Sequence, residues 1–512
     1  MSLSKRPFSL IVAFDKLTHG IDLIWNHIPD DMKRFKDLTT TNMVIMGRKT
    51  WDTLPVRPLP SRSNVIITSR KDYSYMSYTS LEECLRNTKL YDMPKFIIGG
   101  QSIYREALMK DWVHTLYITE VAHTPLALLV TSATSATNEV SGASEASGAS
   151  IASTTSVFTR FFPALTSFNK YFKEVHKEIH EPTSSHPGYT FYTYARDTDI
   201  PMYVSPLEET YLQSLKDTYL SGVIRKGRNG STRSSFSRTF SYTLDKNTLP
   251  LFSTRKMFYR GIVEELLWFL RGQTDSKILE RKGVNIWKQN STRKYLDSKG
   301  LNYREGTLGP TYGWNLRNFG TPFHTPSPEF PFAMPLSHNY DQFAELIQGI
   351  KKDPYSRRHI ISLWDPSVIS QSALPPCMLY YQFYVEDATD AEGIHPRISM
   401  FVLNRSGDAV LGVPWNIAFS SLLLYLVGYL TNTIPYKVNH TIVDFHIYEE
   451  HVPNLERLLS RIPSAKLPTL TLTNMPDPTI SLDKFLDELS PSNFILTDYE
   501  HQPADIEFPM VQ

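Results

Sequence analysis

Residues 46–55 read MGRKTWDTLP and place a glycine between an apolar run and a segment of helical composition. The run that leads into this glycine, NMVIMG at 42–47, is short and apolar, as buried strands of parallel sheets are. The stretch FIIGGQSIY at 96–104 repeats the order of strand, glycine and helix. Two such junctions predict parallel strands that end at one edge of a sheet.

The same pattern continues on both sides of these junctions. Strand-like runs alternate with segments of helical spacing, which indicates an α/β domain with a central, mainly parallel sheet. The strand-like runs are FSLIVAF (8–14), NVIITS (64–69), HTLYITEV (114–121), KYFKEVHKE (170–178) and YTFYTYAR (189–196). The helical segments are DDMKRFKDLT (30–39), LEECLRNT (81–88) and SIYREALMK (102–110).

One segment of this first domain, at about 127–157, differs in composition from the rest. Its centre, TSATSATNEVSGASEASGASIASTTS at 131–156, is small and polar. Such a stretch buries too little apolar surface to offset the entropy lost on ordering, which predicts a disordered insertion. A linker between two domains is the alternative, but the strand-like runs on both sides fit one sheet and favour an insertion.

A second domain begins near ARDTDIPMYVSPLEETYLQSL at 195–215, where polar residues and two prolines precede a new amphipathic helix. Beyond it, long helices mix with strands such as PRISMFVLN (396–404) and HTIVDFHIY (440–448), an α+β texture. We therefore expect two domains, at 1–198 and 199–512.

Composition narrows the class of protein. The 512 residues are 41% hydrophobic and 21% charged, with a net charge of +1. Near-neutral charge argues against a nucleic-acid binder, yet a few local arginines can still hold a small anion. The most apolar stretch, 417–430, is shorter than the roughly 20 residues of a membrane span and predicts a buried helix. With no recognisable targeting signal, the sequence predicts a cytoplasmic protein with no membrane association.

The chain has two cysteines, Cys84 and Cys377, which exclude a disulfide framework and a cysteine-based zinc site. We expect no metal centre. Cys84 sits in an apolar periodic helix and reads as core. Cys377 follows two prolines in ALPPCMLYY (373–381), at the mouth of a strand, and this rigid turn favours a functional thiol.

Charged residues cluster at the glycine junctions of the first domain. Arg48 and Lys49 follow Gly47, and backbone amides at a helix start favour phosphate. The tripeptide TSR at 68–70 ends a third strand and could hold a ribose phosphate. With Gly99-Gly100 these positions suggest a dinucleotide crevice, while two ordinary tight turns remain the alternative.

Three segments of the second domain carry groups suited to chemistry. The tandem Glu264-Glu265 lies in a very apolar helix, so the pair is either a surface edge or includes a semi-buried acid with a raised pKa. Arg357-Arg358 precede a strand and form a candidate anion clamp. The stretch NRSGDAVLGVPWNIA (404–418) gathers polar side chains around a glycine–proline turn.

In the first domain, six ordered segments resemble dihydrofolate reductase: SLIVAF, WNHIPDDMKRFKDLT, MGRKTWDTLP, RPLPSRSNVIITSR, FIIGGQSIY and LYIT. The resemblance implies that Asp31 and Thr119 hold the pterin, Phe35 packs on the folate, and Arg62 grips its glutamyl carboxylate as a bidentate fork. It also implies an NADPH site made of Ala13, Gly47, Arg48, Lys49, Thr50, Ser69, Arg70, Gly99, Gly100 and Tyr104.

A carboxylate suits the reductase chemistry, because it orients the ring while a proton reaches the nitrogen beside the reduced carbon. Position in the motif selects Asp31 over Asp30, whose alternative role is a solvated residue at a helix start. The family's loop before Trp25 is shortened here, which puts closure over the nicotinamide in question.

In the second domain, nearly all of 205–512 resembles thymidylate synthase. The matching segments are RNG, EELLWFLRG, VNIW, LGPTYG, DPYSRRHIISLW, LPPC, QFYV, RSGD, LGVPWNIA and DFHIY. With the first domain in front, the chain resembles the protist bifunctional dihydrofolate reductase–thymidylate synthase family. That implies methylation of dUMP with 5,10-methylenetetrahydrofolate, followed by NADPH-dependent reduction of the dihydrofolate formed.

The resemblance also implies the residues that carry the synthase reaction. Cys377 would add to C6 of the uracil, Glu265 would relay a proton to its carbonyl, and Tyr312 would help remove the C5 proton. Asn416 would recognise the uracil edge, because an amide supplies both donor and acceptor. The remaining implied ligands are Arg228, Arg357, Arg358, Arg405, Ser406, Asp408, His446 and Tyr448 for dUMP, and Trp287 and Asp408 for the folate.

In this family the paired arginines reach in from the other subunit, so a homodimer with Arg357 and Arg358 donated across the interface follows. Departures from the family pattern stand at Asn315, Leu316, Met378, Asn404, Glu450 and Gln512. They motivate a second hypothesis, a catalytically impaired paralogue kept as a dimeric scaffold. The enzyme is favoured, because the side chains that would touch substrate persist.

Overall fold

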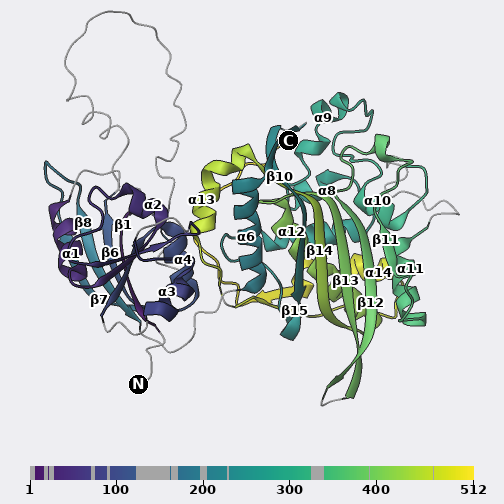
Figure 1. Ribbon diagram of the computed structural model, residues 1–512. Helices are drawn as coiled ribbons and strands as arrows, with labels where there is room; N and C mark the ends of the chain where they lie inside the picture. The colour runs from purple at the N-terminus through teal and green to yellow at the C-terminus, as the bar shows by residue number, and fades with distance from the viewer. Residues whose placement is uncertain are drawn as a thin grey trace, which may run out of the picture. The chain divides into compact units, whose positions relative to one another are not determined.

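The computed structural model describes residues 6–16, 21, 28–70, 75–88, 93–122, 162, 171–196, 205–227, 230–323, 340–390, 393–464 and 466–511. The predicted insertion at 127–157, Trp25 and Arg228 lie outside these residues. Contacts divide the chain into two compact units, drawn in Figure 1. The first contains Met1–Val204 and Pro453–Ala465, and the second contains Ser205–Val452 and Lys466–Gln512.

The first unit is built on an eight-stranded sheet in the order β4-β3-β2-β5-β1-β6-β8-β7. Its strands are β1 (Phe8–Asp15), β2 (Met43–Gly47), β3 (Ser63–Ile67), β4 (Ser77–Tyr78), β5 (Lys95–Gly99), β6 (Val113–Val121), β7 (Phe172–His180) and β8 (Tyr189–Arg196). Only β8 runs antiparallel to its neighbours, β6 and β7. The predicted α/β class with a mainly parallel sheet is confirmed.

Among the described residues before β7, the helices of this unit are α1 (Pro29–Thr39), α2 (Arg48–Thr53), α3 (Leu81–Thr88) and α4 (Gln101–Met109). Apolar side chains of the strands pack on both faces, which explains why β2 reads as a continuous apolar run. Met43 and Ile45 join one core cluster, and Val44 and Met46 join another with Trp51. The parallel register places the carboxyl ends of β1, β2 and β5 at one edge.

The second unit is built on a six-stranded sheet in the order β11-β12-β13-β14-β10-β9. Its strands are β9 (Val223–Gly227), β10 (Gly230–Thr243), β11 (Ile360–Ser362), β12 (Met378–Asp390), β13 (Gly393–Asp408) and β14 (Ile434–Tyr448). Strands β13 and β14 are parallel, and the other neighbouring pairs are antiparallel. A separate pair, β15 (Thr469–Leu472) and β16 (Phe494–Thr497), is also antiparallel.

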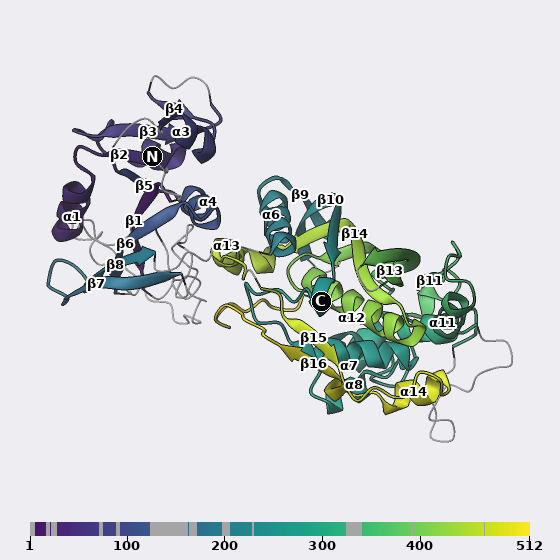
Figure 2. The ribbon, with the colours of Figure 1, turned by 90° about the horizontal axis from the view of Figure 1, so that it is seen from below.

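Helices cover one face of this sheet, as Figures 1 and 2 show for α6 and α12. The helices are α6 (Pro206–Ser221), α7 (Tyr259–Leu270), α8 (Ser276–Arg281), α9 (Arg293–Ser298), α10 (Tyr312–Arg317), α11 (Gln342–Lys352), α12 (Gly412–Thr431) and α14 (Leu482–Glu488). Helix α12 is long and apolar enough to cross a membrane, but 83% of its most apolar window is buried inside the protein. It is the buried helix that the sequence predicts.

Helix α13 (Val452–Ser460) follows β14 in the chain, yet its segment groups with the first unit. Ile462, just beyond the helix, belongs to the main core cluster of that unit. The sequence does not predict that this segment groups with the first unit, because the segment is short and its apolar spacing does not indicate which unit it packs against.

Candidate active sites

Asp31 lies at the start of α1 and faces the sheet. Its Oδ1 accepts a hydrogen bond of 2.5 Å from the hydroxyl of Thr119, a buried residue of β6. Thr119 pairs in register with Ala13 of β1, so the three predicted positions come together in the structure. A half-buried carboxylate fixed by a hydroxyl can orient a bound ring.

Asp30, the neighbouring carboxylate, has a different environment. It is exposed, and its Oδ2 accepts a hydrogen bond of 2.7 Å from the Tyr189 hydroxyl. The two aspartates therefore hold separate partners. Arg34, one turn along α1, donates to the carbonyl oxygens of Ile118 and Tyr192, which ties the helix to the sheet.

The two glycines after β5 form a close cradle against α2. A side chain on Gly99 would place its Cβ 3.0 Å from the Thr50 hydroxyl oxygen, and one on Gly100 would lie 3.3 Å from it. Gly99 also has a φ of +140°, which L side chains rarely adopt. Gly100 caps α4 and has no side chain to occupy the helix amides, which leaves them for an anion.

The other predicted cofactor residues surround this cradle with varied exposure. Gly47 caps α2, and Arg48 forms an ion pair of 2.7 Å with Asp52. Tyr104 is buried and donates to the Ile11 carbonyl oxygen at 2.7 Å, and burial raises its pKa. Exposed side chains complete the set, namely Lys49, Ser69 and Arg70.

Arg62 and Phe35, the predicted folate contacts, lie together. The guanidinium carbon of Arg62 is 5.5 Å from the centre of the Phe35 ring. Arg62 Nε donates to the Thr39 hydroxyl oxygen at 2.8 Å and Nη1 donates to the Pro60 carbonyl oxygen. The arrangement places the Arg62 guanidinium beside the Phe35 ring, which suits a ligand that carries both a carboxylate and an aromatic ring.

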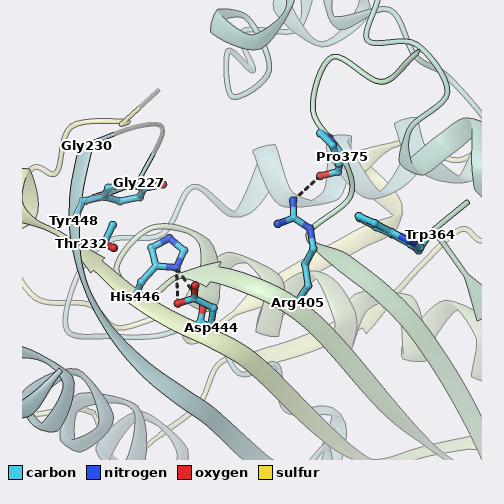
Figure 3. Close-up of a pocket in the computed structure, with 9 residues that line it drawn as sticks. All are labelled: Gly227, Gly230, Thr232, Trp364, Pro375, Arg405, Asp444, His446 and Tyr448. Atoms are coloured by element: carbon cyan, nitrogen blue, oxygen red, sulfur yellow. Dashed lines mark hydrogen bonds and ion pairs between the residues drawn. The ribbon is translucent and has the colours of Figure 1, made fainter. Parts of the chain in front are cut away.

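A pocket of about 450 Å³ opens at the end of the six-stranded sheet in the second unit (Figure 3). Arg405 enters it from β13, and His446 and Tyr448 enter from β14. The remaining lining residues are Gly227, Gly230, Thr232, Trp364, Pro375 and Asp444. The pocket thus combines a cation, a histidine, a phenol and apolar walls.

Cys377 lies next to this pocket, at the start of β12. Arg405 Nη2 is 3.6 Å from its sulfur, and the Arg405 guanidinium also donates to the carbonyl oxygens of Pro375 and Pro376. The Cys377 amide donates to the Tyr312 hydroxyl oxygen at 2.6 Å. The Arg405 guanidinium, fixed by two carbonyl oxygens, thus faces the half-buried sulfur of Cys377.

Glu265 is one of two buried acids of α7. Its two carboxylate oxygens accept hydrogen bonds from the indole N–H groups of Trp287, at 2.7 Å, and Trp415, at 2.6 Å. Burial raises the pKa of Glu265 to about 7, although the two indole hydrogen bonds oppose the shift. Its neighbour Glu264 instead pairs with Lys282 at 2.7 Å. Of the two alternatives for the pair, the structure excludes a surface edge, because both glutamates are buried, and they differ in their partners.

Tyr312 connects these groups at the start of α10. It is buried and stacks on Phe269, with ring centres 4.6 Å apart. Burial raises the pKa of Tyr312 most, and the charges of Cys377 and Glu265 raise it further. The hydrogen bond that Tyr312 accepts from the Cys377 amide opposes this shift. The thiol of Cys377, the phenol of Tyr312 and the carboxylate of Glu265 therefore interact electrostatically.

Asp444 and His446 form a pair on β14 (Figure 3). Burial opposes the charged ring of His446, but hydrogen bonds to Asp444 and the charges of Asp408 and Asp444 outweigh it and raise its pKa. The Ser406 hydroxyl lies 3.5 Å from His446 Nδ1. Asp408 accepts from the amides of Val410 and of the next residue, which fixes the turn before α12.

Some predicted residues lie apart from this pocket. Arg357 and Arg358 are exposed and do not line it, and Asn416 lies in the second turn of α12. The sequence patterns did not select Trp415, which contacts Glu265, or the pocket residues Gly227, Gly230, Thr232, Trp364, Pro375 and Asp444. Asp444 could have been found, because it shares a strand face with His446 and Tyr448 at a spacing of two.

Comparison with known proteins finds relatives of both domains. A family model for dihydrofolate reductase matches residues 8–139, and one for thymidylate synthase matches residues 209–512. A bifunctional dihydrofolate reductase–thymidylate synthase of Zea mays is 32% identical, with 98% of this chain and 97% of the relative covered. The chain belongs to this bifunctional family.

Two proteins of the same name from other lineages agree. The Leishmania major protein is 32% identical over 98% of this chain and 94% of its own length. The Paramecium tetraurelia protein is 32% identical over 90% of this chain and 91% of its own length. Membership of the bifunctional dihydrofolate reductase–thymidylate synthase family makes the chain an enzyme that methylates dUMP with methylenetetrahydrofolate and reduces dihydrofolate with NADPH. Nothing in the comparisons supports the impaired scaffold.

Proposed function

We propose that the two activities reside at the two sites described above, the synthase around Cys377 and the reductase around Asp31. The observation that carries the synthase assignment is the group of Cys377, Arg405 and Tyr312 beside the buried Glu265. A nucleophile, a fixed cation and an acid of near-neutral pKa are what addition to a uracil ring requires.

In this proposal the Cys377 thiolate adds to C6 of dUMP, and the electron pair of the C5–C6 double bond moves toward the C4 carbonyl oxygen. Glu265 supplies a proton to that oxygen, because its raised pKa keeps the acid form present near neutral pH. C5 then forms a bond to the methylene carbon of methylenetetrahydrofolate. Tyr312 lies in the network that takes up the C5 proton. Cleavage of the methylene–nitrogen bond leaves a methylene group on C5 and tetrahydrofolate. Tetrahydrofolate then transfers a hydride to this methylene carbon, which becomes the methyl group while the folate is oxidised to dihydrofolate, and the C6–sulfur bond breaks to release dTMP and restore the Cys377 thiolate.

The pocket in Figure 3 is proposed to bind the dUMP ribose and phosphate. Arg405 provides a guanidinium for the phosphate, and His446 and Tyr448 face the ribose hydroxyl. Ser406 beside His446 adds a hydroxyl. Arg228 completes the proposed phosphate ligands.

The remaining synthase ligands are proposed from their positions around the turn before α12. Asn416 reads the uracil edge with its amide, and Asp408 orients the pterin of the folate. Trp287 forms a wall of the folate site and also holds Glu265 through its indole N–H. These groups bind and orient the substrates before reaction.

For the reductase, the dinucleotide is proposed to lie over Gly99 and Gly100, where the backbone approaches the Thr50 side chain closely and the amides at the start of α4 carry no competing side chain. The proposed contacts of the dinucleotide are Ala13, Gly47, Arg48, Lys49, Thr50, Ser69, Arg70, Gly99, Gly100 and Tyr104. NADPH supplies the hydride when it is bound. Asp31 and Thr119 orient the pterin, while Phe35 and Arg62 hold the rest of the folate.

We propose that the active form is a homodimer joined through the uncovered face of the six-stranded sheet. This face carries exposed apolar side chains: Phe401 is 38% exposed, Ile360 40% and Tyr384 62%. Arg358 lies in the turn two positions before Ile360, the first residue of the edge strand β11. Pairing this face would bring Arg357 and Arg358 to the partner's dUMP phosphate.

We further propose that the chain passes from the reductase domain to the synthase domain near residues 198 and 199, between β8 and α6. A cytoplasmic location fits the two free cysteines, Cys84 and Cys377.

A spectrophotometric assay tests the synthase assignment. The purified chain is mixed with dUMP and methylenetetrahydrofolate, and formation of dihydrofolate is followed by its absorbance. Wild-type protein should produce dihydrofolate and Cys377→Ser should not. A wild-type protein as silent as Cys377→Ser would refute the assignment.

A further inference from the structure

His451 is a buried histidine that the proposed reaction does not use. It follows β14 by a short turn and is 0% exposed. Its Nε2 lies 2.8 Å from the carbonyl oxygen of Pro509, close to the C-terminus. Since a carbonyl oxygen can only accept, Nε2 must carry a proton and donate it.

The other side of the ring faces the synthase pocket. Nδ1 lies 3.6 Å from Oδ1 of Asp408 and has no hydrogen-bond partner among the residues that the structure describes. The ring also meets Tyr448 edge-on, with centres 5.7 Å apart, and Phe508 edge-on at 5.5 Å. The His451 ring therefore lies against Tyr448, which is proposed to bind the nucleotide, against Asp408, which is proposed to bind the folate, and against the C-terminal segment.

Arg255 also connects the turn at Asp408 with the C-terminal segment. It donates to the Val410 carbonyl oxygen at 2.7 Å, and its guanidinium carbon lies 5.7 Å from the Phe508 ring centre. The Val410 amide in turn donates to Asp408 at 2.9 Å. The Asp408 turn and the C-terminal segment are thus connected at two places, by a hydrogen bond at His451 and by a cation–ring contact at Arg255.

We propose that His451 is a positioning residue that holds the C-terminal segment around Pro509 against the Asp408 turn and Tyr448. The inference rests on the proposed synthase function of this pocket. A fully buried imidazole is costly unless its N–H is satisfied, and the Pro509 carbonyl is the partner that satisfies it. The position of the segment is thereby coupled to Asp408 and Tyr448, the residues proposed to hold folate and nucleotide.

Three substitutions separate the contacts of the ring. Glutamine places an amide N–H near the position of Nε2 and keeps the tie to Pro509. Asparagine places its amide near Nδ1 and loses that tie. Phenylalanine keeps the ring contacts with Tyr448 and Phe508 but has no polar atom.

The first measurement is hydrogen exchange of the backbone amides at 503–511 in the unliganded full-length protein. His451→Asn and His451→Phe should exchange about fivefold faster than wild type, the effect of one ordinary hydrogen bond. His451→Gln should stay within about twofold of wild type. Because no substrate is present, this readout does not depend on the proposed activity.

The second measurement is synthase kinetics on the same proteins. In His451→Phe we expect kcat to fall about tenfold and KM for methylenetetrahydrofolate to rise, with KM for dUMP within about twofold. The reason is that a misplaced C-terminal segment affects the orientation of the bound substrates most. His451→Gln should recover most of the loss. A role confined to general stability would not produce this rescue.

Tyr429→Phe is the matched control, because it also removes a donor to a proline carbonyl, that of Pro476 at 3.1 Å. It should leave exchange at 503–511 and synthase kinetics unchanged. Equal behaviour of the three His451 variants, or unchanged exchange in His451→Phe, would overturn the proposal. A wild type without synthase activity would instead refute the function proposed for the pocket and leave the exchange result standing.

Discussion

At the residue scale, the adjacent carboxylates of α1 provide a matched pair. Asp31 bonds to buried Thr119 beside the glycine cradle, whereas Asp30 bonds to Tyr189 and is exposed. Asp31→Asn should lower reductase kcat by about 10²–10³-fold, because the charge that supports proton transfer is lost. Asp30→Asn should stay within about threefold of wild type. Initial rates of NADPH oxidation with added dihydrofolate distinguish them, and equal losses would contradict the assignment.

Glu265 gives a prediction for stability against pH. Its pKa is raised to about 7 in the folded protein, so between its ordinary pKa and 7 the folded state binds more protons than the unfolded state. The contribution of Glu265 to stability is therefore fully present at acid pH and is lost as pH rises toward 7. Relative to Glu265→Gln, the wild type should lose about 3 kcal/mol over this range, from about 1.4 kcal/mol per pKa unit.

Urea unfolding followed by tryptophan fluorescence measures this difference, since Trp287 and Trp415 contact the carboxylate. A difference between wild type and Glu265→Gln that does not vary with pH would mean that Glu265 titrates normally.

The sequence predicted individual residues where local context was strong. Cys84 is fully buried in α3, and Cys377 lies beside Arg405, as their surroundings suggested. The apolar run after the tandem glutamates does not distinguish them, and only the resemblance selected Glu265. Only the tertiary structure shows that the indoles of Trp287 and Trp415 converge on Glu265.

At the element scale, the two glycines that link β5 to α4 differ in what they tolerate. Gly99→Ala puts a Cβ 3.0 Å from the Thr50 hydroxyl oxygen at a φ of +140°, while Gly100→Ala meets the same atom at 3.3 Å with an ordinary φ. Gly99→Ala should destabilise the reductase unit by about 1–3 kcal/mol and raise KM for NADPH. Gly100→Ala should cost less than about 1 kcal/mol. Loss of reductase activity with increasing urea measures both, and the reverse order would contradict the cradle.

Most elements with a clear period were predictable. The strand-like runs of the first domain and helices α3 and α12 lie where their patterns placed them. Strand β4, of two residues, is too short to show a period. The grouping of the α13 segment with the first unit depends on contacts far apart in sequence, which periodicity does not encode.

At the scale of the whole molecule, the proposed exchange of arginines predicts complementation between inactive subunits. Cys377→Ser lacks the nucleophile, and Arg358→Ala lacks a group given to the partner's site. Mixing the two after dissociation and reassembly should restore about a quarter of wild-type synthase activity, since half the dimers are mixed and each has one intact site. Activity that stays at the level of the separate variants would contradict donation across the interface.

The central claim is that one chain makes dihydrofolate at Cys377 and reduces it at Asp31. The most direct measurement supplies dUMP, methylenetetrahydrofolate and NADPH, adds no dihydrofolate, and follows both dTMP and NADPH. We predict one NADPH oxidised for each dTMP formed, neither reaction in Cys377→Ser, and dTMP with accumulating dihydrofolate in Asp31→Asn. Formation of dTMP by the wild type without oxidation of NADPH, or no dTMP at all, would contradict the account.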